Sequence, residues 1–154
     1  MKYFKQKRRS QRGLTLIEFM TVVVIMGILV SIGVVQLIHA KDRATNASVQ
    51  ANMHAFQNVV ELYAVDGGGL YPLSVNNLLN SPELASSSVL YGMKNPITNR
   101  VGLNQAYQDE DTSILQKGII TLDTSNLSQY YIYGYNGKKE RIVIKGQEFI
   151  LSNG

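Results

Sequence analysis

Residues 14–38 read LTLIEFMTVVVIMGILVSIGVVQLI, and Glu18 is the one charged residue among them. A helix of this length, at ~1.5 Å per residue, is long enough to cross a hydrocarbon layer of ~30 Å with some tilt. No other stretch of the 154-residue chain is as apolar. This stretch therefore predicts a single membrane-spanning helix.

The residues before this stretch carry six positive charges and no negative one: Lys2, Lys5, Lys7, Arg8, Arg9 and Arg12. Such a cluster is expected to stay on the cytoplasmic side and to send the rest of the chain outward. With six of the fifteen basic residues in this leader, residues 14–154 hold nine basic against eleven acidic side chains. The basic pI of about 9.3 thus describes the leader, and we predict no specific nucleic-acid binding.

An ordinary secretory signal peptide is a poor explanation, because its apolar region of ~7–15 residues is shorter and is followed by a small-residue cleavage site. A plain signal anchor explains the length but not Glu18. A carboxylate in hydrocarbon costs roughly 2.5–3.5 kcal/mol on insertion scales. The precursor offers it no partner within a helical turn downstream. Cleavage after Gly13 would give Leu14 a positive α-amino group, on the same or a neighbouring chain, that could compensate the carboxylate.

Residues 12–20, RGLTLIEFM, followed by TVVVIMGIL, resemble the class III signal of type IV prepilins and pseudopilins. The resemblance implies that a membrane aspartyl peptidase cuts between Gly13 and Leu14. It also implies N-methylation of Leu14 and a subunit-docking role for Glu18. Leu14 stands where this family most often has Phe, and no proline interrupts the apolar segment.

The helical pattern continues without Pro or Gly from residue 39 to residue 65 and has two opposed apolar faces. One consists of the small residues Ala40, Ala44, Ala47, Ala51 and Ala55, and the other of the large residues Val49, Met53, Phe56, Val60 and Tyr63. We expect the large face to lie under a β-sheet and the alanine face to contact neighbouring helices in a filament core, although alanine is also a good residue for an exposed helix. In the membrane segment, Gly27 and Ser31 have the small-xxx-small spacing that permits close helix packing.

The C-terminal part is predicted to be a small antiparallel β-sheet. Asp66 and three glycines end the helix, and the following Tyr71-Pro72 pair resembles the same junction in pilins. Ser74 is expected to cap a short helix through Leu79, residues 81–113 to be mostly loop, and strands to cover residues 119–122, 130–135, 141–144 and 148–151. Asn136-Gly137 predicts a type I′ hairpin, and Lys145-Gly146 a second turn.

The predicted fold class is therefore α+β, the lollipop of pilins, with a long N-terminal helix packed on a small antiparallel sheet. We expect four regions: a cleaved basic leader (1–13), a transmembrane or filament-core helix (14–38), its amphipathic continuation (39–65) and a globular head (66–154).

Catalytic and metal-binding patterns are weak. The chain has no cysteine and two histidines, His39 and His54, and contains no metal-protease, serine-elbow or cysteine-nucleophile motif. The carboxylates of Asp109, Glu110, Asp111 and Asp123 are weak candidates for calcium ligands, but a solvated acidic loop is the simpler interpretation. We expect no enzymatic activity, no metal and no cofactor.

Three functions follow as expectations. The leading one is a structural subunit of a type IV pilus-like filament, with copies of itself, other pilins, the prepilin peptidase and a membrane assembly platform as partners. The alternative is a pseudopilin of a type II secretion system. A third, from another class, is an unprocessed, signal-anchored extracytoplasmic binding protein. The first two place the chain in the cytoplasmic membrane and then in an extracellular pilus or a periplasmic pseudopilus.

Overall fold

The structure is a computed structural model that describes residues 13–82, 84, 88–112 and 114–153. The predicted basic leader lies outside the described residues except for Gly13. The chain divides into two compact units, Met1–His39 and Ala40–Gly154. The second unit, called the head below, contains the strands and the two short helices found among the described residues.

The long helix α1 (Leu16–Asp66) has residues in both units. It contains no proline, and it ends where Gly68 and Gly69 adopt left-handed backbone angles, φ 69° and 92°. The amides of Gly67 and Gly69 donate hydrogen bonds to the carbonyls of Tyr63 and Ala64, which closes the last turn. The predicted helix end is confirmed.

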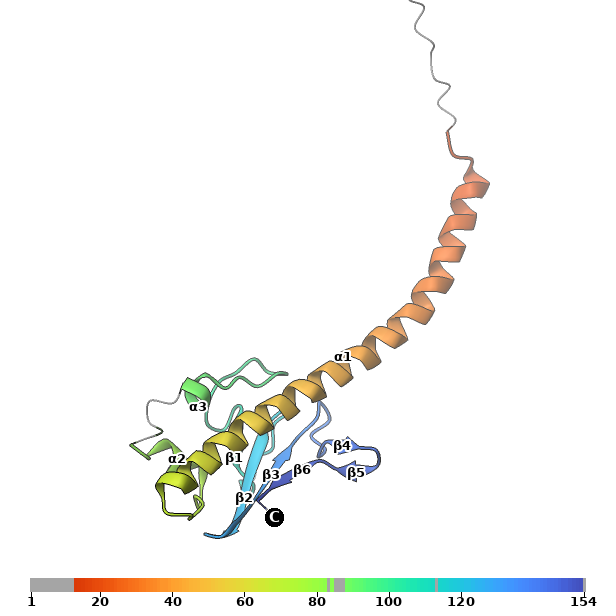
Figure 1. Cartoon of the computed structure of the whole chain (residues 1–154). Helices are drawn as coiled ribbons and strands as arrows, with labels where there is room; N and C mark the ends of the chain where they lie inside the picture. The colour runs from red at the N-terminus through yellow and green to blue at the C-terminus, as the bar shows by residue number, and fades with distance from the viewer. Residues whose placement is uncertain (1–12, 83, 85–87, 113, 154) are drawn as a thin grey trace, which may run out of the picture. The chain divides into compact units, whose positions relative to one another are not determined.

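A four-stranded sheet forms the centre of the head, in the order β1-β2-β3-β6 (Figure 1). The strands are β1 (Tyr107–Asp109), β2 (Ile120–Asn126), β3 (Gln129–Gly134) and β6 (Ile150–Ser152). Strands β2, β3 and β6 pair antiparallel, as predicted, whereas β1 pairs parallel to β2. The α+β fold class is confirmed, with a mixed sheet in place of a purely antiparallel one.

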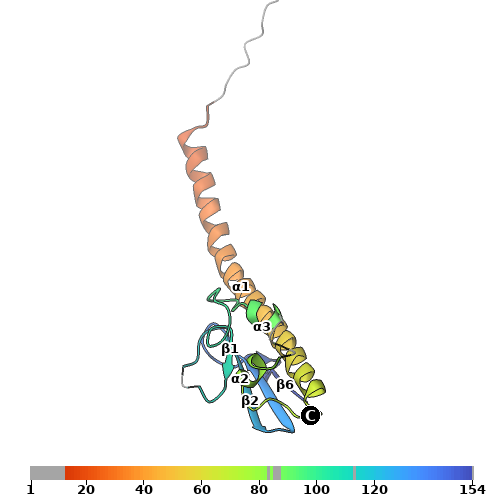
Figure 2. The ribbon, with the colours of Figure 1, turned by 90° about the vertical axis from the view of Figure 1, so that its left-hand side faces the viewer.

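One face of this sheet packs against the head portion of α1 (Figure 2). The predicted large face of the helix supplies Val49, Met53, Phe56 and Val60, none of which is exposed, and Tyr63 packs at its edge. Alternate residues of β2 and β3 meet them, including Leu122, Tyr130 and Ile132. The prediction for this helix face is confirmed.

Gly134 sets the closest approach between β3 and α1. A Cβ at this position would lie 2.5 Å from the sulfur of Met53 and 2.9 Å from a methyl carbon of Val49. Only glycine lets the strand lie this close to the helix.

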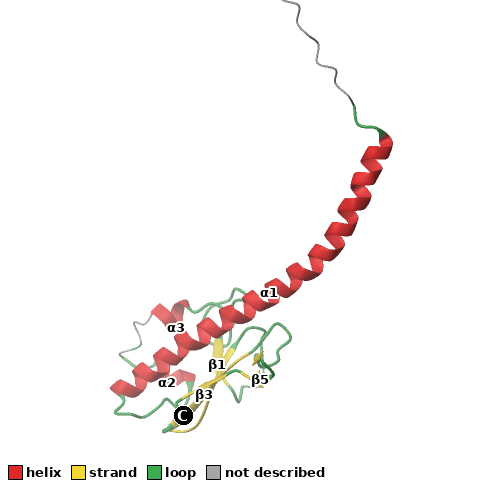
Figure 3. Ribbon diagram, turned by 45° about the vertical axis from the view of Figure 1, so that its right-hand side comes forward, coloured by secondary structure: helices red, strands yellow, loops and turns green. Residues whose placement is uncertain are grey.

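Two short helices, α2 (Val75–Leu79) and α3 (Ser88–Gly92), precede the sheet (Figure 3). The helix predicted after Ser74 is confirmed, but its predicted cap is wrong. The Ser74 hydroxyl donates to Asn77 Oδ1 at 2.5 Å, and the Val75 amide donates instead to Asp109 Oδ1 at 2.7 Å. A carboxylate from β1 therefore caps the first turn of α2.

The predicted type I′ turn at Asn136-Gly137 is also wrong. Such a turn needs positive φ at both central residues, whereas in residues 136–140 it is Lys139 that has positive φ, 65°. Asn136 Oδ1 accepts hydrogen bonds from the amides of Lys138 and Glu140, so the side chain organises a longer loop. The two-residue turn with positive φ at both positions is Lys145-Gly146 (52° and 86°), between β4 (Val143–Ile144) and β5 (Gln147–Glu148).

Candidate processing and assembly site

The predicted cleavage site lies immediately before α1, in non-helical chain. Gly13 is exposed, and a Cβ on it would have no atom within 4 Å. The Leu14 side chain is 78% exposed. The Gly13–Leu14 bond is thus accessible and lies outside the helix, and cleavage there stays a prediction.

Thr15 and Glu18 form a reciprocal pair at the first turn of α1. The Thr15 amide and hydroxyl both donate to Glu18 Oε2, at 2.9 and 2.8 Å. The Glu18 amide in turn donates to the Thr15 hydroxyl oxygen at 3.3 Å. This arrangement is a capping box, in which residues three apart satisfy amides that the start of a helix leaves free.

The capping box changes the expectation for Glu18. The sequence reasoning gave this carboxylate no partner before cleavage, but Thr15 lies one turn upstream and provides two donors. The signal was present in the sequence as the pattern Thr-x-x-Glu directly before an apolar run. Thr15 is thus a site residue that the sequence reasoning missed.

The other hydroxyl groups of the segment are also bonded within the helix. Thr21 donates to the carbonyl of Ile17 at 2.9 Å, and Ser31 donates to the carbonyl of Ile28 at 2.8 Å. Internal bonding of this kind lowers the cost of placing a polar side chain in hydrocarbon.

The α1 portion of the first unit is long and apolar enough to cross a membrane, and none of its residues is buried. Gly27 and Ser31 lie one turn apart on it, and a Cβ on Gly27 would meet nothing within 4 Å. Its small residues are therefore open to a neighbour.

The predicted alanine face lies on the exposed side of the head's helix. Ala40, Ala44, Ala47 and Ala51 are exposed, whereas Ala55 is partly buried against the core. Four of these five alanines are thus exposed in the part of the chain that the structure describes, and their role in a filament stays a prediction.

Two of the four acidic candidates for calcium binding, Asp109 and Glu110, have separate partners in the head. Asp109 caps α2, and Glu110 pairs with Arg141 at 2.9 Å while accepting from the hydroxyl of Tyr135 at 2.8 Å. Burial, with the nearby charge of Asp111, raises the pKa of Asp109, and the hydrogen bond from Val75 opposes the increase. Within the described ranges, no three His, Cys, Asp or Glu side chains come together as a metal site.

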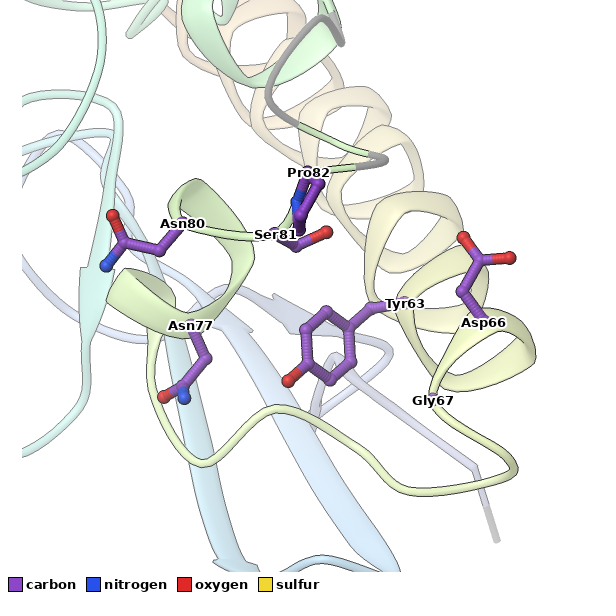
Figure 4. A pocket seen from close by; sticks show the side chains of 7 residues that line it. All are labelled: Tyr63, Asp66, Gly67, Asn77, Asn80, Ser81 and Pro82. Atoms are coloured by element: carbon purple, nitrogen blue, oxygen red, sulfur yellow. The ribbon is translucent and has the colours of Figure 1, made fainter.

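A hollow of about 370 Å³ lies between the end of α1 and α2 (Figure 4). It is lined by Tyr63, Asp66, Gly67, Asn77, Asn80, Ser81 and Pro82. Figure 4 shows the Tyr63 ring pointing toward α2, while the Asp66 carboxylate lies on the other side of the helix. The lining offers amides, hydroxyls and the carboxylate of Asp66.

Comparison with known sequences identifies the N-terminal segment. A family described as the prokaryotic N-terminal methylation motif matches residues 8–34. The chain is 40% identical over 72 residues to the type II secretion system core protein G of Klebsiella michiganensis, a match that covers 47% of this chain and 50% of the relative. It is 37% identical over 83 residues to the protein of the same name from Aeromonas hydrophila, covering 52% and 57%.

A third protein of this name, from Vibrio cholerae, is 37% identical over 73 residues, covering 47% of this chain and 49% of the relative. The chain thus matches about half the length of these relatives. No solved structure matches it significantly. The methylation motif, the apolar helix that it begins and the similarity to these relatives support a place in the type IV prepilin and pseudopilin family.

Proposed function

We propose that this chain is a pseudopilin, a structural subunit of the pseudopilus of a type II secretion system. The observation that carries the proposal is the methylation motif at residues 8–34, which begins an apolar stretch, residues 14–38, exposed along its whole length. The relatives named type II secretion system core protein G favour this alternative over the pilus subunit that the sequence reasoning put first.

In this proposal, hydrolysis of the Gly13–Leu14 bond releases the leader and leaves a positive amine on Leu14, which is then methylated. The exposure of both residues supports access by the peptidase. Removal of six basic residues leaves a slightly acidic subunit, with nine basic and eleven acidic side chains.

Glu18 would then contribute to docking. Its Oε2 already accepts two hydrogen bonds from Thr15, and these hold the carboxylate at the start of the helix. Oε1 can accept a bond from the terminal amine of a neighbouring subunit. An amine and a carboxylate paired in this way reduce the cost of burying either charge in a filament core.

Before assembly, the subunit would be anchored in the cytoplasmic membrane by residues 14–38, with the head outside. Assembly would bury this segment, Gly27 and Ser31 among its contacts, together with the exposed alanine face. Partners in this proposal are further copies of the chain, other pseudopilins, the prepilin peptidase and the membrane platform. The family is structural, and catalysis by this chain forms no part of the proposal.

N-terminal mass spectrometry tests the processing step. The chain is co-expressed with a prepilin peptidase and purified from membranes, and the expected product begins with N-methyl-Leu14. An otherwise identical culture without the peptidase should retain Met1. A chain that keeps Met1 in both cultures, or begins at another residue, refutes processing and favours the signal-anchored binding protein.

Electron microscopy tests the kind of filament. In cells that carry a type II secretion system, deletion of this subunit should abolish secretion, and overproduction should give filaments that disappear when Glu18 is changed to Ala. Long surface filaments at native expression, with secretion intact after deletion, would instead support the pilus interpretation.

A further inference from the structure

The loop of residues 136–140 lies at the end of the head where α1 enters. At the other end of the head, Tyr130 of β3 donates to Glu61 of α1. Four residues later, Gly134 touches Met53 and Val49. Strand β3 therefore runs toward the start of the head portion of α1, and the loop that follows it lines one hollow of about 420 Å³ with Lys41, Asp42, Thr45 and Asn46.

This end of the head carries four exposed basic side chains: Lys41, Arg43, Lys138 and Lys139. We call them the basal cluster. Both ion pairs found within the described residues belong to Arg141, so no member of the basal cluster has an acidic partner there. Two carboxylates lie close to the cluster, Asp42 and Glu140, and Glu140 accepts a hydrogen bond from the Asn136 amide at 3.3 Å. The four basic side chains and these two carboxylates together carry a net charge of +2.

The loop presents its lysines in a defined conformation. Lys139 has positive φ, which is uncommon for lysine. Its amide donates to the carbonyl of Asn136, and the Asn136 side chain accepts from the amides on either side of Lys139.

The position of the cluster along the chain points to a ligand. Lys41 and Arg43 follow Ile38, the last residue of the apolar stretch, by three and five residues. At ~1.5 Å per residue, this distance places them within ~8 Å of the hydrocarbon boundary, where lipid phosphates lie. Lysine and arginine bind phosphate by charge-assisted hydrogen bonds.

We propose that the basal cluster binds the head groups of anionic phospholipids while the subunit waits in the membrane. The contact holds the base of the head against the bilayer, and it is released when the subunit leaves the membrane for the filament. This inference rests on the membrane-anchored state of the proposed function.

The absence of cysteine allows a single label on the full-length chain. Gly137→Cys carries a fluorophore at the base, because a Cβ there would have its nearest neighbour at 3.9 Å. Ser128→Cys carries it at the far end, beside Leu127, whose carbonyl accepts from Tyr71 just beyond α1. The helix between Lys41 and Asp66 separates these ends by ~37 Å. The chain is reconstituted into vesicles in which a fraction of lipids bears a nitroxide quencher on the head group.

The base label should be quenched more strongly in phosphatidylglycerol vesicles than in phosphatidylcholine vesicles, and the difference should disappear at ~1 M salt. In the double variant Lys138→Gln with Lys139→Asn, the ratio of subunits whose head is bound to lipid to subunits whose head is free should fall roughly thirtyfold. The matched control compares the single variants Lys145→Asn and Lys139→Asn. Both lysines are exposed and have positive φ, so the two substitutions remove the same charge from the same kind of backbone position. The far label should not respond to lipid charge.

Equal quenching of the base label in both lipids overturns the inference. An equal loss from Lys145→Asn also overturns it, because the effect would then follow total charge. A chain that fails to float with vesicles of either lipid refutes the membrane anchor itself, and with it the proposed function. Flotation without charge-dependent quenching refutes the lipid contact alone.

Discussion

The two portions of α1 differ in apolar content and have opposite surroundings. Phe19, in the first unit, is 63% exposed, whereas Phe56, in the head, is completely buried. The first portion is apolar on every side, and the second is apolar toward the sheet and polar or small elsewhere. A helix that is apolar on one side is buried within its own chain, whereas a helix that is apolar on all sides and exposed in its own chain indicates burial by a membrane or by other chains.

The largest expected effect comes from the buried member of this pair. Phe56→Ala should lower the free energy of unfolding of the head by ~3–5 kcal/mol, because it removes a core side chain and leaves a cavity. Phe19→Ala should leave the stability of the head unchanged. Denaturant unfolding in detergent, followed by tyrosine fluorescence, measures both, since the chain has nine tyrosines and no tryptophan. Equal losses would mean that the two portions are not independent.

A smaller loss is expected at the closest approach of β3 and α1. Gly134→Val should cost ~1–3 kcal/mol of unfolding free energy, because its side chain would overlap with Met53 and Val49. Gly137→Val is the control, with no atom closer than 3.9 Å to its Cβ. Combining Gly134→Val with Met53→Ala should recover part of the loss, and no recovery would contradict a steric cause.

The capping carboxylate should contribute ~1 kcal/mol. Asp109→Ala leaves the Val75 amide without its acceptor, whereas Asp109→Asn keeps an acceptor oxygen and removes the charge. Asparagine should therefore retain most of the stability that alanine loses, as measured by denaturant midpoints.

The same residue predicts a pH dependence. Burial raises the pKa of Asp109 above its ordinary 3.8, so the folded chain holds this proton where the unfolded chain has released it. The contribution of Asp109 to stability should accordingly fall as pH rises from about 3.8 through the folded pKa. Asp109→Asn should remove this decrease, and an unchanged pH profile would contradict the assignment.

The smallest effect on the head is expected at its exposed alanines. Ala47→Lys or Ala51→Lys should change the stability of the head by less than about 0.5 kcal/mol, because both positions are exposed. If this face packs in a filament, the same substitutions should prevent assembly, as seen by electron microscopy. Normal filaments, or an unfolded head, would refute the packing proposal.

Sequence periodicity was sufficient where structure is local. It predicted α1, the side of α1 that the sheet covers, and most of the antiparallel strands. The capping box was also readable, because Thr15 and Glu18 are three residues apart. The expectation for Glu18 rested on the residues downstream of it, whereas Thr15 lies upstream.

Long-range pairing accounts for what the sequence could not predict. Strand β1 is three residues long, and nothing local to Tyr107 indicates parallel pairing with Ile120. Asp109 is 34 residues from the amide that it caps. Asn136-Gly137 favours a two-residue turn locally. The bridge between Tyr135 and Arg141 instead closes a longer loop, residues 136–140, and the chain then forms the separate β4–β5 hairpin.

The cluster around Glu61 has a mechanical consequence. Glu61 accepts hydrogen bonds from the hydroxyls of Tyr130 and Tyr71, and Gln57 donates to the Tyr130 hydroxyl at 3.1 Å. In the proposed function, extraction from a membrane would load the subunit along the axis of α1, and β3 runs antiparallel to that axis. Such a load would be transmitted from α1 to β3 through the hydrogen bonds of Glu61 and Gln57 together. These bonds would be loaded in shear, in parallel, and would not break one after another. These hydrogen bonds thereby tie the far end of the helix to the sheet.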